Sequence, residues 1–278
     1  MKPRSGGIEG RPASLLIPAS IALAFLLLPL VAILGEAPWD GFLSLASSPT
    51  ALEALRLSLI ASVSAAAIAF VTGVPLAWLL ARDVLPGTRL WRALVIVPLL
   101  LPPVVSGVAL LSAFGRRGLV GSWIYEWTGF QFPFSIAGVI IAGAFVALPF
   151  LVITVESAFR SVDRDIEEAA AVDGASTQRI FRSITLPAIA PALVAGTVLA
   201  WARAIGEFGA TITFAGNLEG VTQTMPLAVY QALESDRDSA IALSIMLLIV
   251  AVAILVSLRG HYLVGGSSTP KFKNSSTN

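Results

Sequence analysis

The sequence predicts an all-α membrane protein with six transmembrane helices. Of its 278 residues, 56% are hydrophobic and only 13% are charged, which is too apolar for a soluble domain. A spanning helix needs about 20 apolar residues, whereas barrel strands are about 10 residues long and alternate in polarity. Six apolar runs reach helical length, at 14–35, 57–81, 93–114, 135–159, 184–214 and 239–258.

The first run could be a cleaved signal peptide, because Lys2, Arg4 and Arg11 precede it. A signal peptide has an apolar core of about 7–15 residues, however, and the uninterrupted run here is longer. We therefore expect an uncleaved first helix. The chain divides into an N-terminal segment (1–13), a single transmembrane domain (14–260) and a small, polar C-terminal tail (261–278) that we expect to be disordered.

Orientation follows from the basic residues, because short cytoplasmic loops are enriched in Lys and Arg. With the N-terminus inside, the outer segments hold only Arg56, Arg116, Arg117 and Arg237, and Arg203 lies within the fifth run. All other Lys and Arg residues then fall in inner segments. We expect both termini, and the polar loop 160–183 between the fourth and fifth runs, to be cytoplasmic.

The loop 160–183 carries helix signals on both sides of a glycine. Its Glu168-Ala169-Ala170 segment favours a helix, and Gly174 is the residue type that commonly follows a helix end. Ser176 or Thr177 can cap a second short helix. From the residues alone, this loop is either a docking element for a partner or a solvated connector.

Glu168-Ala169-Ala170, three residues, Gly174, nine residues and then Ile184-Thr185-Leu186-Pro187 together resemble the cytoplasmic motif of permease subunits of ATP-binding-cassette importers. The resemblance implies the type I importer permease fold, in which this segment is a coupling helix seated in a cleft of the ATPase subunit. By resemblance, the interface residues are Glu168, Ala169, Ala170 and Gly174, with Asp173 as a further polar contact.

The segment from Trp201 to Thr211, with Phe214 to Asn217 and Thr222 to Pro226, is similar to the fifth helix and outer loop of molybdate permeases. Sulfate permeases share part of this pattern. The resemblance implies import of a tetrahedral oxyanion across a prokaryotic inner membrane, with molybdate as the favoured substrate. It further implies two identical permease chains, two ATPase subunits that use ATP and Mg, and an outer substrate-binding protein.

Two opposite charges lie within the fifth run. Arg203 and Glu207 are four residues apart, so on one helix they would share a face. Charges at membrane depth tend to pair or to face water. They are either a structural pair or a neutral wall of the translocation pathway. Gly209, Thr211 and Thr213 continue a small, mildly polar surface, which serves either helix packing or a pore lining.

The residues that are missing exclude several functions. The sequence has no cysteine and one histidine, His261, so we expect no metal site and no catalytic residues. No Gly-x-x-x-x-Gly-Lys-Ser/Thr element is present, so ATP hydrolysis must come from another chain, and we expect no cofactor on this one. The open alternatives are a sulfate or tungstate permease and, in a different class, an ion-coupled secondary anion transporter.

Overall fold

The computed structural model describes residues 13–262, so the two predicted terminal segments lie almost entirely outside the described residues. Every regular element between residues 13 and 262 is helical, as predicted. Five helices are long and apolar enough to cross a membrane, and a bent pair of shorter helices could be a sixth span.

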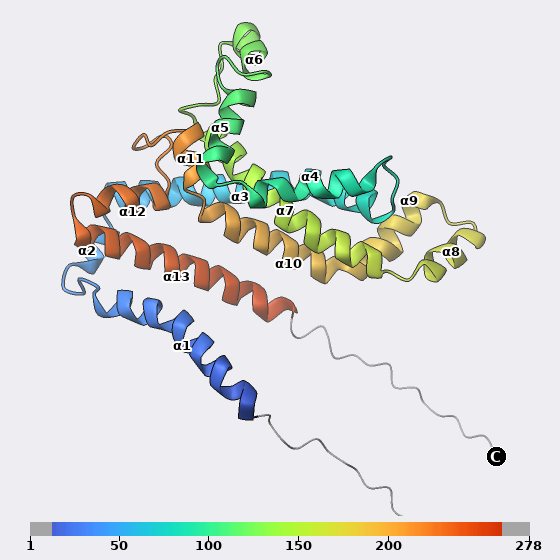
Figure 1. Cartoon of the computed structure of the whole chain (residues 1–278), viewed down its shortest axis with the longest axis horizontal. Helices are drawn as coiled ribbons and strands as arrows, with labels where there is room; N and C mark the ends of the chain where they lie inside the picture. The colour runs from blue at the N-terminus through green and yellow to red at the C-terminus, as the bar shows by residue number, and fades with distance from the viewer. Residues whose placement is uncertain (1–12, 263–278) are drawn as a thin grey trace, which may run out of the picture.

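Three long helices form the centre of the molecule: α3 (Pro49–Ala81), α7 (Ile136–Ser161) and α10 (Leu186–Ile205), which pack against one another (Figure 1). Small residues allow this packing, since a Cβ added to Gly73 of α3 would lie 2.8 Å from Cδ2 of Leu151 on α7. Helices in lipid associate through such close contacts because lipid is as apolar as the side chains themselves.

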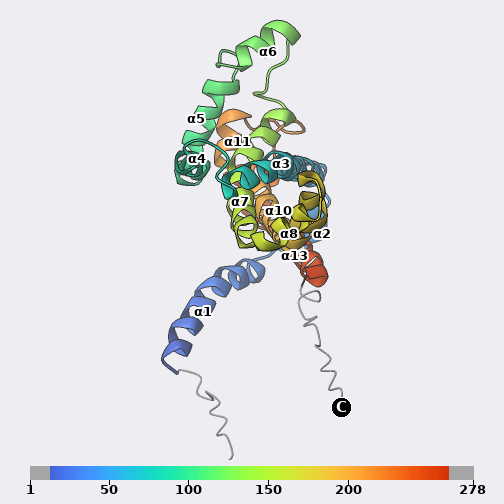
Figure 2. The same ribbon diagram turned by 90° about the vertical axis from the view of Figure 1, so that its right-hand side faces the viewer.

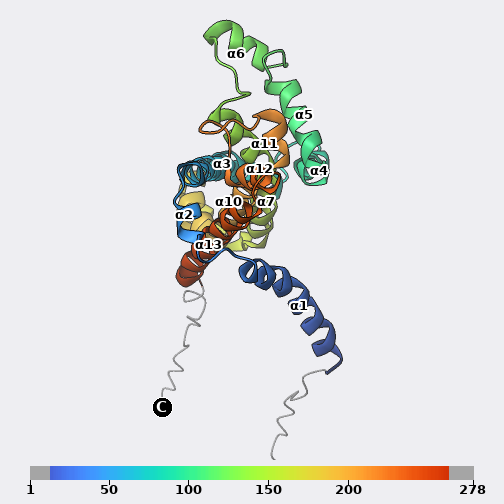
Figure 3. The ribbon, with the colours of Figure 1, turned by 90° about the vertical axis from the view of Figure 1, so that its left-hand side faces the viewer.

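Helices α2 (Phe42–Ala46), α12 (Met225–Leu233) and the start of α13 (Arg237–Tyr262) lie together at one end of the long helices (Figure 1). Helix α1 (Ala13–Gly35) extends away from the bundle (Figures 2 and 3). Its outer end is tied to α13 by an ion pair in which Arg237 Nη2 lies 2.6 Å from Glu36 Oε2.

The second span begins earlier than predicted. We expected a loop up to residue 56, but α3 starts at Pro49, because Ser48 Oγ accepts a hydrogen bond from Ala51 N at 3.3 Å and proline suits the first turn of a helix. The helix is consequently 33 residues long.

The third span is not one helix, so the continuous run predicted at 93–114 is wrong. It consists of α4 (Thr88–Leu100) and α5 (Pro103–Phe114), which are bent by 117°. The cause is the pair Pro102 and Pro103, because proline lacks an N–H and disfavours helix at the residue before it. Helix α5 leads to α6 (Gly121–Thr128), where the Arg116 guanidinium carbon lies 4.2 Å from the centroid of the Tyr125 ring.

The fifth span is also interrupted. Helices α8 (Arg164–Val172) and α9 (Thr177–Ile180) lead through a π-helical turn, η1 (Phe181–Thr185), into α10. Helix α10 ends at Ile205, and a separate helix, α11 (Gly209–Phe214), follows. The prediction of one helix over 184–214 is therefore wrong at both ends.

Candidate functional site

The loop 160–183 folds as its sequence signals predict. Asp163 Oδ1 accepts a hydrogen bond from Asp165 N at 3.0 Å at the start of α8. Gly174 follows the end of α8 with a φ of +85°, a left-handed conformation that favours glycine. Ser176 Oγ accepts from Arg179 N at 3.4 Å at the start of α9. The predicted order of helix, glycine and helix is confirmed.

Helix α8 lies at one end of the molecule, beyond the long helices (Figure 1). The predicted interface residues are accessible here: Glu168, Ala169, Asp173 and Gly174 are exposed and Ala170 is half-buried. Val172 in the same helix is 87% exposed.

Glu167, which the sequence analysis did not single out, is the residue that attaches α8 to the membrane helices. Arg82 Nη2 lies 2.6 Å from both of its carboxylate oxygens, and Thr185 Oγ1 donates to Oε1 at 2.5 Å. No local signal could have found this contact, because the partners lie 85 and 18 residues away along the chain.

A second ionic cluster joins the same end of α3, α4 and α7. Arg92 Nε lies 2.6 Å from Glu156 Oε1, and Arg92 Nη2 lies 2.8 Å from Asp83 Oδ1. Arg160 Nη2 is 3.0 Å from the same Glu156 oxygen. The loop 160–183 therefore emerges beside a region that is held by several charge-assisted hydrogen bonds.

Arg203 and Glu207 pair as predicted, but not on one continuous helix, because Glu207 follows the end of α10. Arg203 Nη2 lies 2.6 Å from Glu207 Oε2, and the other carboxylate oxygen accepts from Ala210 N at 2.7 Å in the first turn of α11. The side chain of Glu207 is 3% exposed and that of Arg203 is 30% exposed. The pair therefore bridges the break between two helices.

The remaining predicted pathway residues lie in α11, which packs against α5. A Cβ added to Gly209 would lie 2.4 Å from Pro103 Cβ. A Cβ added to Gly107 of α5 would lie 2.5 Å from the Cβ of Thr213. Thr211 is buried, and Thr213 Oγ1 donates to the Gly209 carbonyl at 2.9 Å. In this structure these residues form a close helix contact, and their role in a pathway stays a prediction.

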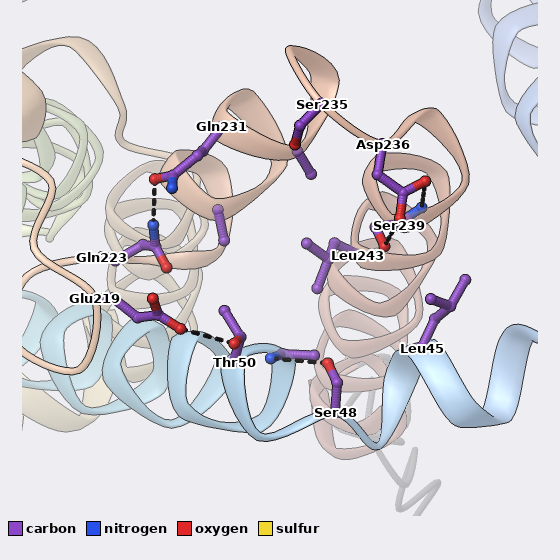
Figure 4. Close-up of a pocket in the computed structure, with 13 residues that line it drawn as sticks. Leu45, Ser48, Thr50, Glu219, Gln223, Gln231, Ser235, Asp236, Ser239 and Leu243 are labelled. Atoms are coloured by element: carbon purple, nitrogen blue, oxygen red, sulfur yellow. Dashed lines mark hydrogen bonds between the residues drawn. The ribbon is translucent and has the colours of Figure 1, made fainter.

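The end of the molecule opposite α8 holds a polar cavity of about 320 Å³ between α3, α12 and α13 (Figure 4). Thr50 Oγ1 donates to Glu219 Oε1 at 2.7 Å on its wall, and Ser239 Oγ donates to Asp236 Oδ2 at 2.5 Å. Hydrogen bonds from Ser239 and then from Asp238 hold the pKa of Asp236 below its ordinary value. Two carboxylates make this cavity unsuited to an anion.

Comparison with known proteins adds independent observations. Residues 73–264 match the family described as binding-protein-dependent transport system inner membrane component. The molybdenum transport system permease protein ModB of Mycobacterium tuberculosis is 42% identical over 91% of this chain and 96% of its own length. The Escherichia coli protein of the same name is 40% identical over 76% of this chain and 92% of its own. The sulfate transport system permease protein CysT of Salmonella typhimurium is 33% identical over 84% and 85%.

Solved structures match the fold. A chain of a bacterial alginate ABC transporter, crystallised with an alginate-bound periplasmic protein, has a TM-score of 0.74 at 20% identity and covers 92% of this chain and 94% of its own. A chain of the MetNI methionine ABC transporter in an inward-facing conformation has a TM-score of 0.56 at 18% identity, with 76% and 92% covered. At such identities the likeness concerns the fold alone.

Proposed function

This chain belongs to the family of binding-protein-dependent transport system inner membrane components. We propose that it moves a tetrahedral oxyanion into the cell and that this anion is molybdate. It is a multi-pass inner-membrane permease subunit of an importer. Molybdate is favoured because relatives named for molybdenum transport are 39–43% identical, whereas the sulfate relatives are 32–33% identical. Sulfate and tungstate remain the alternatives, because all three anions are tetrahedral and carry the same charge.

The energy for import comes from a separate ATPase subunit that binds ATP and Mg. The observation that carries this proposal is the exposed surface of α8, where Glu168, Ala169, Asp173 and Gly174 surround the protruding Val172. Helix α8 is nine residues long, and a short helix of this kind is recognised by seating in a groove of its partner. Family membership argues against the ion-coupled alternative, which would leave this helix without a role.

Two identical permease chains, two ATPase subunits and one outer binding protein complete the assembly. Both termini are cytoplasmic, supported by the excess of Lys and Arg in the inner segments. Closure of the ATPases around nucleotide then changes the separation of the two α8 helices. Because nucleotide binds the closed ATPase pair more tightly, it shifts the permease between inward-open and outward-open states.

Arg203, Glu207, Gly209, Thr211 and Thr213 flank the pathway at the break between α10 and α11. Pairing at 2.6 Å leaves the site nearly neutral, so an anion is neither held nor repelled there. An unpaired arginine would bind the anion tightly, whereas passage requires weak sites. The small residues let α5 approach α11 closely and so set the width of the pathway.

The substrate is tested with the complex of permease, ATPase and binding protein reconstituted in lipid. ATPase activity is measured with molybdate, tungstate and sulfate at matched concentrations of loaded binding protein. We expect stimulation by molybdate at the lowest concentration. Stimulation by sulfate alone would refute the molybdate assignment without affecting the assignment as a permease.

Docking is tested with Gly174→Asp, and Gly129→Asp is its matched control. Both glycines have a positive φ, +85° and +70°, and a Cβ on either would meet no atom within 4 Å. The two variants therefore carry similar backbone strain, but Gly129 follows α6 on the outer side. We expect only Gly174→Asp to lose co-purification of the ATPase. Equal co-purification for both variants would refute docking at α8.

A further inference from the structure

Glu167 is the one charged residue of α8 that is partly buried. The flanking Ile166 and Glu168 are exposed, whereas the Glu167 side chain is 18% exposed and faces the membrane helices. Its carboxylate receives hydrogen bonds from two elements at once, from Arg82 and from Thr185. A partner protein that binds the exposed side of α8, away from the bundle, leaves these contacts in place.

The two contacts of Glu167 connect α8 to the end of α3 and to the start of α10. Arg82 is the residue directly after α3, the 33-residue helix that runs through the centre of the molecule. Thr185 is the last residue of the π-helical turn η1, is 2% exposed, and immediately precedes α10. Helices α3 and α10 both pack against α7, so a displacement of either end is passed to the whole core.

The hydrogen bond from Thr185 to Glu167 is made at the end of the π-helical turn η1. Single π-turns within α-helices are uncommon and are frequent at functional sites. In η1 the ring of Phe181 packs edge-on against Trp78 of α3 and stacks on Phe159 of α7, with centroids 6.0 and 6.2 Å apart. Glu167 thus holds the polar side of a turn whose apolar side is held by aromatic rings.

A cavity adjoins the junction between α8 and the bundle. A cavity of about 350 Å³ lies between the end of α7, the start of α8 and the start of α10, and Asp163 and Ile166 are among its lining residues. Between α8 and the other described helices, the side-chain hydrogen bonds all end on Glu167. Its charge-assisted contacts, together with the short backbone linkers on either side of α8, therefore connect this helix to the bundle.

We propose that Glu167 is the positioning residue that transmits motion of α8 to the transport helices, through Arg82 to α3 and through Thr185 and the π-turn to α10. This proposal rests on the proposed function, since it takes α8 as the site where the ATPase acts. It assigns to Glu167 a role separate from docking. ATPase binding uses the exposed face of α8, and coupling uses the face that Glu167 occupies.

The test compares variants in the reconstituted complex with its binding protein and with the anion that the wild type transports. Glu167→Gln and Arg82→Gln each remove the ionic contact, and Thr185→Val removes the hydroxyl donor. Asp165→Asn and Arg89→Gln are matched controls, because Asp165 is an exposed charge of α8 and Arg89 is an exposed charge in the first turn of α4, shortly after Arg82. The readouts are ATPase co-purification and the number of anions imported per ATP hydrolysed.

We expect Glu167→Gln and Arg82→Gln to retain the ATPase but to import about tenfold fewer anions per ATP, the size expected when a charged hydrogen bond is lost. The double variant should fall no further than either single variant, because both remove the same contact. The controls should match the wild type. Retained docking with lost coupling separates this proposal from the proposed function, which predicts loss of docking in Gly174→Asp.

A normal import ratio in Glu167→Gln, or an equal loss in Asp165→Asn, would overturn the proposal. If Glu167→Gln does not assemble, Thr185→Val decides by the same ratio: a lowered ratio supports the proposal and an unchanged one refutes it. Exchanging the two charges, as Glu167→Arg with Arg82→Glu, should restore part of the ratio that either single reversal loses. A merely structural role would instead lower the yield of the complex and leave the number of anions imported per ATP unchanged.

Discussion

Substitution of Gly209 by alanine tests the contact between α5 and α11 with a single methyl group. The added Cβ would lie 2.4 Å from Pro103 Cβ, whereas carbon atoms in contact are normally about 3.5–4.0 Å apart. The helices must therefore separate by about 1 Å, and Pro103 cannot yield by changing rotamer because its ring is part of the backbone. Overpacking of this kind costs about 1–3 kcal/mol.

The matched control is Gly206→Ala, three residues earlier. A Cβ there would meet only the Ala202 carbonyl oxygen, at 3.8 Å, which is ordinary van der Waals contact. Its φ of −90° is also allowed for alanine. This variant should unfold at the wild-type temperature or slightly above it, because alanine restricts the unfolded chain.

The assay is thermal unfolding of the purified protein in detergent, followed by helical circular dichroism. We expect Gly209→Ala to lower the midpoint by about 2–10 °C, the shift that 1–3 kcal/mol gives in a chain of this size. A midpoint equal to that of the wild type would refute the close contact. The reasoning would fail equally if Gly206→Ala lost as much stability.

Two further predictions concern charge. Arg203→Gln should destabilise the protein more than Glu207→Gln. Loss of Arg203 leaves the 3% exposed Glu207 carboxylate without its ion pair, at a cost of about 3–5 kcal/mol. Loss of the Glu207 charge costs less, because Arg203 is 30% exposed and can still reach water. Thermal midpoints of the two variants check this order, and normal uptake in both would remove any pathway role. Because the pKa of Asp236 is lowered in the folded state, its ionised form adds stability that is fully present above the unfolded pKa of about 3.9 and is lost as pH falls through the folded pKa. The midpoint difference between wild type and Asp236→Asn should therefore close below about pH 4, and a difference that stays constant from pH 7 to pH 3 would contradict the assignment.

The loop 160–183 was predictable because its signals act over a few residues. A cap such as Ser176 bonds to a backbone group three residues away, and the left-handed conformation at Gly174 depends on that residue alone. The break in the fifth span after Ile205 was not predicted, and for the third span the prolines predicted a kink but not a 117° bend between two separate helices. Pro102 and Pro103 signalled a kink, but proline within an apolar run is also compatible with a continuous membrane helix, since neighbouring helices can satisfy the freed backbone groups.

Composition and local pattern by themselves determined that this chain is a helical membrane protein and where the short helices of the loop 160–183 begin and end. Only the tertiary structure decided that Glu167 meets Arg82 and Thr185, and that Gly209 meets Pro103. The physical reason is the range of the forces. Hydrophobic runs and caps act within a turn or along one helix, whereas these contacts depend on how distant helices pack, which no spacing in the sequence encodes.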